Sequence, residues 1–242
     1  MKRNIIHLEQ TDSTNRWLHD MKEEPEGMTV VVADFQTAGK GQGTNKWESE
    51  QGKNLLMSIL VHPTYVHPTR QFLLSEAGAL AVGDALSSYV EGITLKWPND
   101  IYWHDRKISG TLIETTVNSH GLQRCIFGIG LNVNQTEFLG DAPNPVSLAQ
   151  ILHHTLSVED VEMRVIDEFE REMALLEKGK EEDIIKRYHQ MLYRKDGWHR
   201  YRDKDGIFVA TISHVENDGH LCLVDEEGRK RMYAFKEVEF LL

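Results

Sequence analysis

Short apolar runs alternate with amphipathic stretches along the first two thirds of the chain. Three runs are apolar, rich in branched side chains and bounded by turn residues, which predicts buried strands over residues 29–33, 54–61 and 125–133. Residues 71–90 carry small and apolar side chains at helical spacing, so we expect a helix between two of these strands. Strands that alternate with helices in this way indicate an α/β type of domain.

A hairpin is expected in the middle of the chain. Residues 108–117 and 122–133 both have the pattern of strands, and the polar turn Asn118-Ser119-His120-Gly121 separates them. The sheet should therefore contain antiparallel pairs, unlike a purely parallel, doubly wound sheet.

The last third of the chain changes character. Apolar residues recur about every four positions from Val161 to Leu176, after a segment that resembles a capping box at Ser157 to Asp160. A second helix is expected over residues 181–192. Beyond Trp198, short strands alternate with three turns that each end in glycine, which is typical of a small β-barrel. We therefore expect a domain boundary between residues 194 and 195.

Composition narrows the class of protein. The chain has 242 residues and a formal net charge of −11, and an acidic chain is not expected to bind nucleic acid. Two cysteines, Cys125 and Cys222, cannot form a disulfide framework, which favours a reducing compartment. The first residues lack the apolar run of a signal peptide, and no apolar stretch reaches the ~20 residues of a membrane span. We expect a cytoplasmic protein without a membrane partner.

A glycine-rich segment follows the first predicted strand. Residues 36–47 read QTAGKGQGTNKW, with three glycines within five residues and two lysines, Lys40 and Lys46. Glycines let backbone N–H groups approach an anion closely, and the lysines add positive charge. The segment matches neither the P-loop nor the dinucleotide-binding pattern, because Gly41 follows Lys40 and Thr44 stands where a glycine is needed. By itself it fits a flexible surface loop equally well.

Polar residues also cluster at the ends of predicted strands. In Lys96-Trp97-Pro98-Asn99-Asp100 the proline ends a strand, and a turn at residues 104–105 would bring Lys107 near Asp100. Taken alone, this pair is an ordinary surface salt bridge worth ~0–1 kcal/mol.

Two other segments have simple structural interpretations. Gly128 and Gly130 lie inside a strand, which indicates either a bulge or the close approach of a ligand. Residues 11–15 are typical of a helix N-cap. The histidines and cysteines show no zinc-ligand spacing, so we expect no structural zinc. The sequence also lacks the G-x-S-x-G motif, which gives little support to a hydrolase.

Taken together and in this order, these motifs resemble the biotin protein ligases, the biotin–[acetyl-CoA-carboxylase] ligase family. The matching segments are residues 12–15, 36–41, 96–100, 107–110 and 128–132, and residues 235–240 resemble the family's final strand. The resemblance implies an α+β fold with a class II aminoacyl-tRNA-synthetase-like catalytic domain that holds biotin and ATP (residues 1–194). A small SH3-like C-terminal domain (residues 195–242) would follow. Some members carry an N-terminal DNA-binding domain, whereas here the first motif begins near residue 12, which implies the single-function type.

The resemblance implies an ATP-dependent, AMP-forming ligase. Such an enzyme converts biotin and ATP to biotinyl-5′-AMP and then transfers biotin to a lysine of a biotin carboxyl carrier protein, with ATP and Mg²⁺ as cofactors. Two alternatives stay open, namely a lipoate or octanoate ligase or transferase of the same fold and a biotin-binding protein without catalysis. The R-R-x-x-G-G-G signature that is usual in the lipoate and octanoate families is absent from this sequence. The oligomeric state, including a homodimer, is also open.

The resemblance assigns catalysis to Lys107, Lys40 and Asp100. It assigns biotin binding to Ser13, Thr14, Asn15, Gln36, Gly39, Lys40, Gly41, Trp47, Lys107, Gly110, Gly128 and Gly130. It assigns ATP binding to Lys40, Gln42, Asn45, Trp47, Asn99, Lys107 and Asn132. Asp100 either binds Mg²⁺ or orients the incoming lysine. The loop departs from the family's arginine-rich G-R-G-R-x-G-R-x-W pattern, so we expect it to retain the adenylate less firmly.

Overall fold

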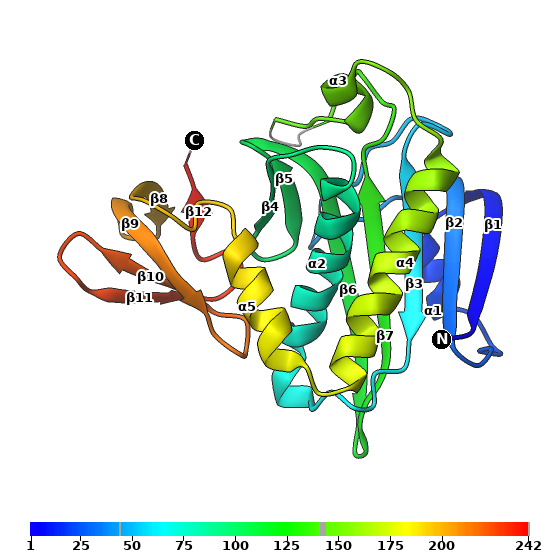
Figure 1. The fold of residues 1–242 in the computed structure, drawn as a ribbon, viewed down its shortest axis with the longest axis horizontal. Coiled ribbons are helices and arrows are strands. Elements are labelled where there is room, and N and C mark those ends of the chain that lie inside the picture. The colour runs from blue at the N-terminus through cyan, green and yellow to red at the C-terminus, as the bar shows by residue number, and fades with distance from the viewer. Residues whose placement is uncertain (44, 141–143, 242) are drawn as a thin grey trace.

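The computed structural model describes residues 1–43, 45–140 and 144–241. A seven-stranded sheet forms the larger part of the molecule, and a five-stranded sheet lies at the other end (Figure 1). The strand order in the large sheet is β1-β2-β3-β7-β6-β5-β4. Its strands are β1 (Arg3–Thr11), β2 (Met28–Gln36), β3 (Leu55–Val61), β4 (Ile93–Lys96), β5 (Asp100–Trp103), β6 (Arg106–Asn118) and β7 (Gly121–Leu131).

The large sheet is mixed, as expected. β1 and β2 pair in parallel, and every other neighbouring pair is antiparallel. The predicted hairpin is β6–β7, whose turn is closed by a hydrogen bond from the His120 N–H to Asn118 Oδ1 at 2.7 Å. The three predicted buried strands are confirmed within a few residues at each end.

Helices cover both faces of this sheet. α2 (Phe72–Ser87), α4 (Val158–Glu177) and α5 (Glu181–Met191) lie on one face, where they enclose the main core (Figure 1). α1 (Thr14–His19) packs on the opposite face, where Leu18 contacts Val31 of β2 in a second buried cluster. Because successive side chains of a strand point to opposite faces, Val30 and Val32 contribute to the main core instead.

The hydrophobic pattern of the sequence did not predict two short helices. The 3₁₀ helix η1 spans Pro68–Arg70, and α3 spans Leu148–Leu152. Elements of one turn are too short to display a helical period. A capping box forms at α3 between Ser147 and Gln150, whereas at α4 the Ser157 side chain accepts from the Asp160 N–H at 3.1 Å.

The C-terminal sheet has the order β11-β10-β9-β8-β12, with every pair antiparallel. It comprises β8 (His199–Asp203), β9 (Gly206–Val215), β10 (Leu221–Asp225), β11 (Lys230–Tyr233) and β12 (Glu239–Phe240). This arrangement agrees with an SH3-like module, and we call it the C-terminal barrel. The final strand expected over residues 235–240 is shorter, because a turn closed by the Glu237 N–H and the Ala234 carbonyl precedes it. The boundary at residue 194 stays a prediction.

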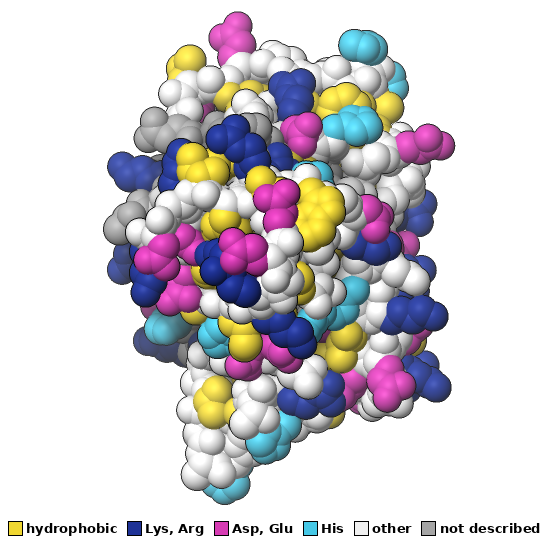
Figure 2. Space-filling view, turned by 90° about the vertical axis from the view of Figure 1, so that its left-hand side faces the viewer, with side chains coloured by type: hydrophobic (Ala, Val, Ile, Leu, Met, Phe, Trp, Pro, Cys, Tyr) yellow, Lys and Arg dark blue, Asp and Glu magenta, His cyan; other side chains and the backbone are white. Residues whose placement is uncertain are grey.

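The barrel and the larger part meet at a turn. The Trp97 indole N–H donates to the Gly219 carbonyl at 2.9 Å, and Phe72 packs against the same glycine. Seen from the barrel end, acidic and basic side chains are interspersed over the surface (Figure 2). Among the described residues, no helix has the length and apolarity needed to cross a membrane.

Candidate active site

A cavity of about 990 Å³ opens on the sheet beside the glycine-rich segment. It receives residues from the start of α1, the segment 40–48, the β4–β5 turn, β6 and β7. Of all the site residues that the sequence predicts, only Gly39 does not line it. Tertiary folding therefore brings five separate motifs together around one space, which has the size of a small-molecule site.

An ion pair lies in the wall of this cavity. Lys107 Nζ is 2.6 Å from Asp100 Oδ1, and each side chain is about one-fifth exposed, at 20% and 19%. The expected proximity of the two residues is confirmed, because β5 and β6 pair across the turn that follows Trp103. Gly110 lies opposite Asp100, and a Cβ on this glycine would stand 3.2 Å from both charged groups.

Lys96 is a cation that the sequence-based assignment left without a role. It lies opposite Asp100 across β4 and β5 and also lines the cavity. Burial lowers the pKa of Lys96, although Asp100 acts in the opposite direction. Its ammonium nitrogen lies 5.3 Å from the centre of the Tyr102 ring and 4.9 Å from that of Phe240, within the range of cation–π attraction.

Polar side chains at the start of α1 form a buried network. The Thr14 hydroxyl and N–H both donate to Gln36 Oε1, at 3.1 and 2.8 Å. Ser58 Oγ lies 2.6 Å from both Thr14 Oγ1 and Asn15 Oδ1, and Asn15 Nδ2 donates to a carboxylate oxygen of Glu114 at 2.8 Å. The predicted helix start is confirmed with Ser13 at the N-cap position, although the Ser13 side chain makes no capping hydrogen bond.

Gly128 and Gly130 make room for side chains of this chain. A Cβ on Gly128 would stand 2.1 Å from Asn15 Oδ1, and one on Gly130 would stand 2.4 Å from the Trp47 ring. Both glycines line the cavity, and their role beside a ligand stays a prediction. They also seat Asn15 and Trp47, which form part of the same wall.

The glycine-rich segment folds back on itself as a narrow loop. Lys40 and Lys46 form an antiparallel bridge, and the Gly41 N–H donates to the Asn45 carbonyl at 2.8 Å. The Gly41 N–H is therefore engaged inside the loop, while Gly41 itself lines the cavity. Gly39 lies beneath the loop, where a Cβ would stand 2.8 Å from the Trp47 carbonyl oxygen. Thr44 lies outside the described residues.

Two asparagines of the cavity wall are held by backbone carbonyls. Asn132 Nδ2 donates to Val146 O at 3.1 Å, and Asn99 Nδ2 donates to Thr111 O. These bonds fix the side-chain amides, because each uses a donor that could otherwise rotate freely.

Three polar atoms of the cavity wall are buried without a partner among the described residues. They are Gln42 Oε1, Trp47 Nε1 and Thr111 Oγ1. An unpaired buried polar atom costs about 1–3 kcal/mol, so each one in a folded protein calls for an explanation such as an absent ligand or water. The presence of three in one cavity wall supports a binding site for a partly polar molecule.

Sequence reasoning missed several residues of the cavity wall. They are Lys46, Glu48, Met57, Lys96, Pro98, Thr111, Leu112, Ile129, Phe138, Leu139, Gly140, Pro145 and Phe235. Lys96 and Pro98 belong to a recognised motif, so the motif could have indicated them. Phe235 comes from the C-terminal barrel, and no local pattern indicates that it reaches the cavity.

The chain also matches a known family by sequence. Residues 7–132, more than half of the chain, match the model of the "Biotin/lipoate A/B protein ligase family". The chain belongs to this family. The matched range contains every predicted site residue, from Ser13 to Asn132.

Individual relatives are similar over longer stretches. The bifunctional ligase/repressor BirA of Bacillus subtilis is 28% identical over 252 aligned residues, which cover 97% of this chain and 73% of that protein. The biotin–[acetyl-CoA-carboxylase] ligase of Paracoccus denitrificans is 29% identical, covering 63% of this chain and 66% of that protein. A structure of the biotin protein ligase from Aquifex aeolicus in complex with biotin and ATP is 25% identical, with a TM-score of 0.81. The match covers 98% of this chain and 97% of that one.

Proposed function

We propose that this chain is a biotin protein ligase. It activates biotin with ATP to give biotinyl-5′-AMP and pyrophosphate, and it then transfers biotin to a lysine of a biotin carboxyl carrier protein. The observation that carries this proposal is the pairing of Lys107 with Asp100 in a cavity that also holds three unpartnered polar atoms. The family membership and the similarity to the Aquifex biotin protein ligase support it.

The adenylation step brings two anions together. The biotin carboxylate must attack the α-phosphate of ATP, so cations have to offset their repulsion and the negative charge that develops at phosphorus. Lys107 stands between the two groups in our proposal, and Lys40 and Lys46 of the loop face the phosphates. Lys107 can exchange Asp100 for the anions, because an ion pair that is one-fifth exposed is open to competition by ligands.

Biotin has a polar ureido head and an apolar body. The Ser13 hydroxyl and the Gln36 side-chain amide line the cavity and supply donors for the ureido oxygen. Met57, Leu112 and Ile129 supply apolar walls of the same cavity. A dithiolane ring, as in lipoate, would leave these donors unpaired, which favours biotin over lipoate.

Asp100 and Glu48 are the carboxylates among the described lining residues of this cavity, and Asp100 is the one paired with Lys107. Among the described residues, no cluster of three His, Cys, Asp or Glu side chains could hold a metal ion alone. Mg²⁺ commonly binds through one or two carboxylates together with substrate phosphates, so Asp100 and a nucleotide fit it. Mg²⁺ would neutralise phosphate charge when bound. In the second step, the same carboxylate would orient the acceptor amine and receive its proton.

A single incubation tests this function. The purified protein is mixed with ATP, Mg²⁺, biotin and an apo biotin carboxyl carrier domain, and the carrier mass is measured, with lipoate replacing biotin in a parallel sample. A mass gain of one biotinyl group in the biotin sample alone is expected. Modification in the lipoate sample alone would contradict the proposal, and so would the absence of both pyrophosphate release and carrier modification.

Lys107→Ala identifies the residue that supports adenylation. We expect pyrophosphate release to fall by at least about 100-fold, because a positioned charge in a water-poor site commonly supplies this much. Lys2→Ala is a matched control, since this exposed lysine precedes β1 and does not line the cavity. Near-normal release by Lys107→Ala, with an unchanged melting temperature, would refute the assignment.

A further inference from the structure

A second cavity of about 260 Å³ adjoins the first, and the role of this space is not explained by adenylation. The two cavities share Gln42, Pro98, Asn99, Thr111, Leu112 and Phe235 in their walls. We call the part of the space that these shared residues enclose the neck. From the neck, the second cavity extends toward α2 and the C-terminal barrel. It is smaller than the 300–1,000 Å³ usual for a small-molecule site, so it fits a side chain better than a free ligand.

Aromatic rings line the second cavity. Phe72, Trp97 and Phe235 face it, and the Trp97 and Phe235 ring centres lie 6.3 Å apart. The Trp97 indole N–H is already engaged with the Gly219 carbonyl, so these rings offer faces and edges without hydrogen-bond donors. Such walls suit an aliphatic stem and attract an ammonium group through cation–π interaction.

The charge of the second cavity is opposite to that of the first. Among its described lining residues there is no lysine or arginine, and Asp218 and His220 are paired at 2.9 Å near the surface. The first cavity is lined by four lysines instead, at positions 40, 46, 96 and 107. A phosphate or carboxylate would therefore bind in the first cavity, whereas the second cavity favours a cation.

Two unpartnered acceptors stand at the neck. Gln42 Oε1 and Thr111 Oγ1 are buried, have no partner among the described residues, and belong to the walls of both cavities. Thr111 is bound through its N–H to the Asn99 carbonyl, one residue before Asp100. An ammonium that passes from Asp218 to Asp100 would thus meet oxygen acceptors between the two cavities.

We propose that the second cavity is the access route of the acceptor lysine, with the four methylene groups between the aromatic rings and the amine directed through the neck toward Asp100. This inference rests on the proposed function. In the transfer step, the deprotonated amine nitrogen attacks the carbonyl carbon of biotinyl-5′-AMP and forms the C–N bond. The bond between the acyl carbon and the bridging phosphate oxygen breaks, AMP leaves with that electron pair, and the amine proton passes to the Asp100 carboxylate.

Filling the cavity tests the route. Ser75 lies on α2 and lines the second cavity only, so Ser75→Phe adds bulk there and Ser75→Ala is the matched control. Three rates are measured: biotin-dependent pyrophosphate release, capture of the adenylate by hydroxylamine, and transfer to an apo carrier domain. Ser75→Phe should slow transfer about tenfold or more, since displacing a reactant by about 1 Å already has a large effect. Pyrophosphate release and biotinyl hydroxamate formation should not change.

A second variant keeps the test valid if Ser75→Phe does not fold. Asp218→Asn should raise the KM for the carrier about two- to fivefold, as expected for one exposed charge. Asp205→Asn, in another exposed turn of the barrel, should leave it unchanged. Equal transfer rates in Ser75→Phe and Ser75→Ala would overturn the proposal, and so would a parallel loss of hydroxamate formation. A wild-type protein that releases no pyrophosphate with biotin would instead refute the proposed function.

Discussion

At the level of single residues, the pair formed by Lys107 and Asp100 depends on a glycine. Gly110 faces Asp100 across β5 and β6, and any side chain there would crowd both charged groups. Gly130 has the same relation to Trp47. Both glycines lie in strands, which glycine weakens. In return, each leaves space for a neighbouring functional side chain to take its position.

Glu76 makes stability depend on pH. This residue of α2 is only 3% exposed, and burial raises its pKa to about 8, although the Arg70 charge acts in the opposite direction. An unfolded glutamate has a pKa near 4.3. The folded state therefore binds the proton more tightly than the unfolded state. This contribution to the free energy of unfolding is fully present below the unfolded pKa, and it is lost as the pH rises through the folded pKa of about 8.

Glu76→Gln should remove this dependence. We expect the variant to be more stable than the wild type at pH 9, and the difference to shrink steadily as the pH is lowered to 5. The free energy of unfolding in urea at several pH values measures it. A difference that is constant with pH would mean that Glu76 does not titrate in this range.

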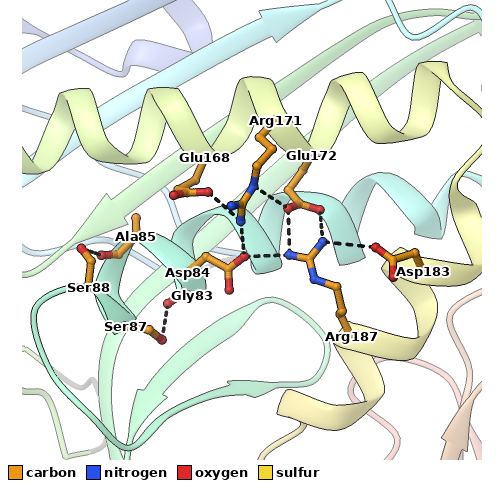
Figure 3. Close-up of polar contacts among 10 residues, drawn as sticks. All are labelled: Gly83, Asp84, Ala85, Ser87, Ser88, Glu168, Arg171, Glu172, Asp183 and Arg187. Carbon is orange, nitrogen blue, oxygen red and sulfur yellow. Dashed lines mark hydrogen bonds and ion pairs between the residues drawn. The ribbon is translucent and has the colours of Figure 1, made fainter.

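At the level of elements, charged groups join three helices that cover the sheet. Arg187 of α5 donates to both carboxylate oxygens of Glu172 on α4, at 2.9 and 2.8 Å, and to Asp84 of α2 at 2.7 Å (Figure 3). Arg171 of α4 also contacts Asp84, at 2.8 Å. Glu172 is fully buried, so its charge requires these partners.

Arg187→Met tests this network. The substitution leaves the buried Glu172 carboxylate with only Arg171, whose Nε lies 3.6 Å away, and breaking a buried ion pair typically destabilises a protein by about 3–5 kcal/mol. Arg164→Met on the exposed side of α4 is the control, with an expected change within about 0.5 kcal/mol. Urea unfolding monitored by circular dichroism compares the two. Equal losses would show that the network contributes no more than a surface charge.

At the level of the whole molecule, the C-terminal barrel completes the wall of the active-site cavity. Phe235 lines the first and second cavities, and the turn at Gly219 is held by Trp97 and Phe72. The position of the barrel relative to α2 therefore affects the shape of the site. Contacts of this kind connect residues that are more than one hundred positions apart.

Gly219→Ala should loosen this contact. The glycine has φ of +94°, and a Cβ would stand 2.7 Å from the Phe72 ring. Gly228 is the matched control, since its φ is +76° and a Cβ there would meet nothing within 4 Å. Both alanine variants bear backbone strain, and only Gly219→Ala should also speed proteolysis between α5 and β8. Equal cleavage rates would show that the Phe72 contact is unimportant for docking.

The sequence by itself determined most of the elements and the order of the motifs. Strand and helix periods predicted most of the large sheet, and the short turn after Trp103 was sufficient to place Lys107 near Asp100. These features depend on interactions between residues close in sequence, and local pattern is informative about such interactions.

Only the tertiary structure decided what surrounds the motifs. It placed Lys96 and Phe235 at the cavity, engaged the Gly41 N–H within its own loop, and filled the space over Gly128 with Asn15. Each of these depends on how distant segments pack. Packing follows from the volume and burial of many side chains at once, and the local pattern of one segment does not contain that information.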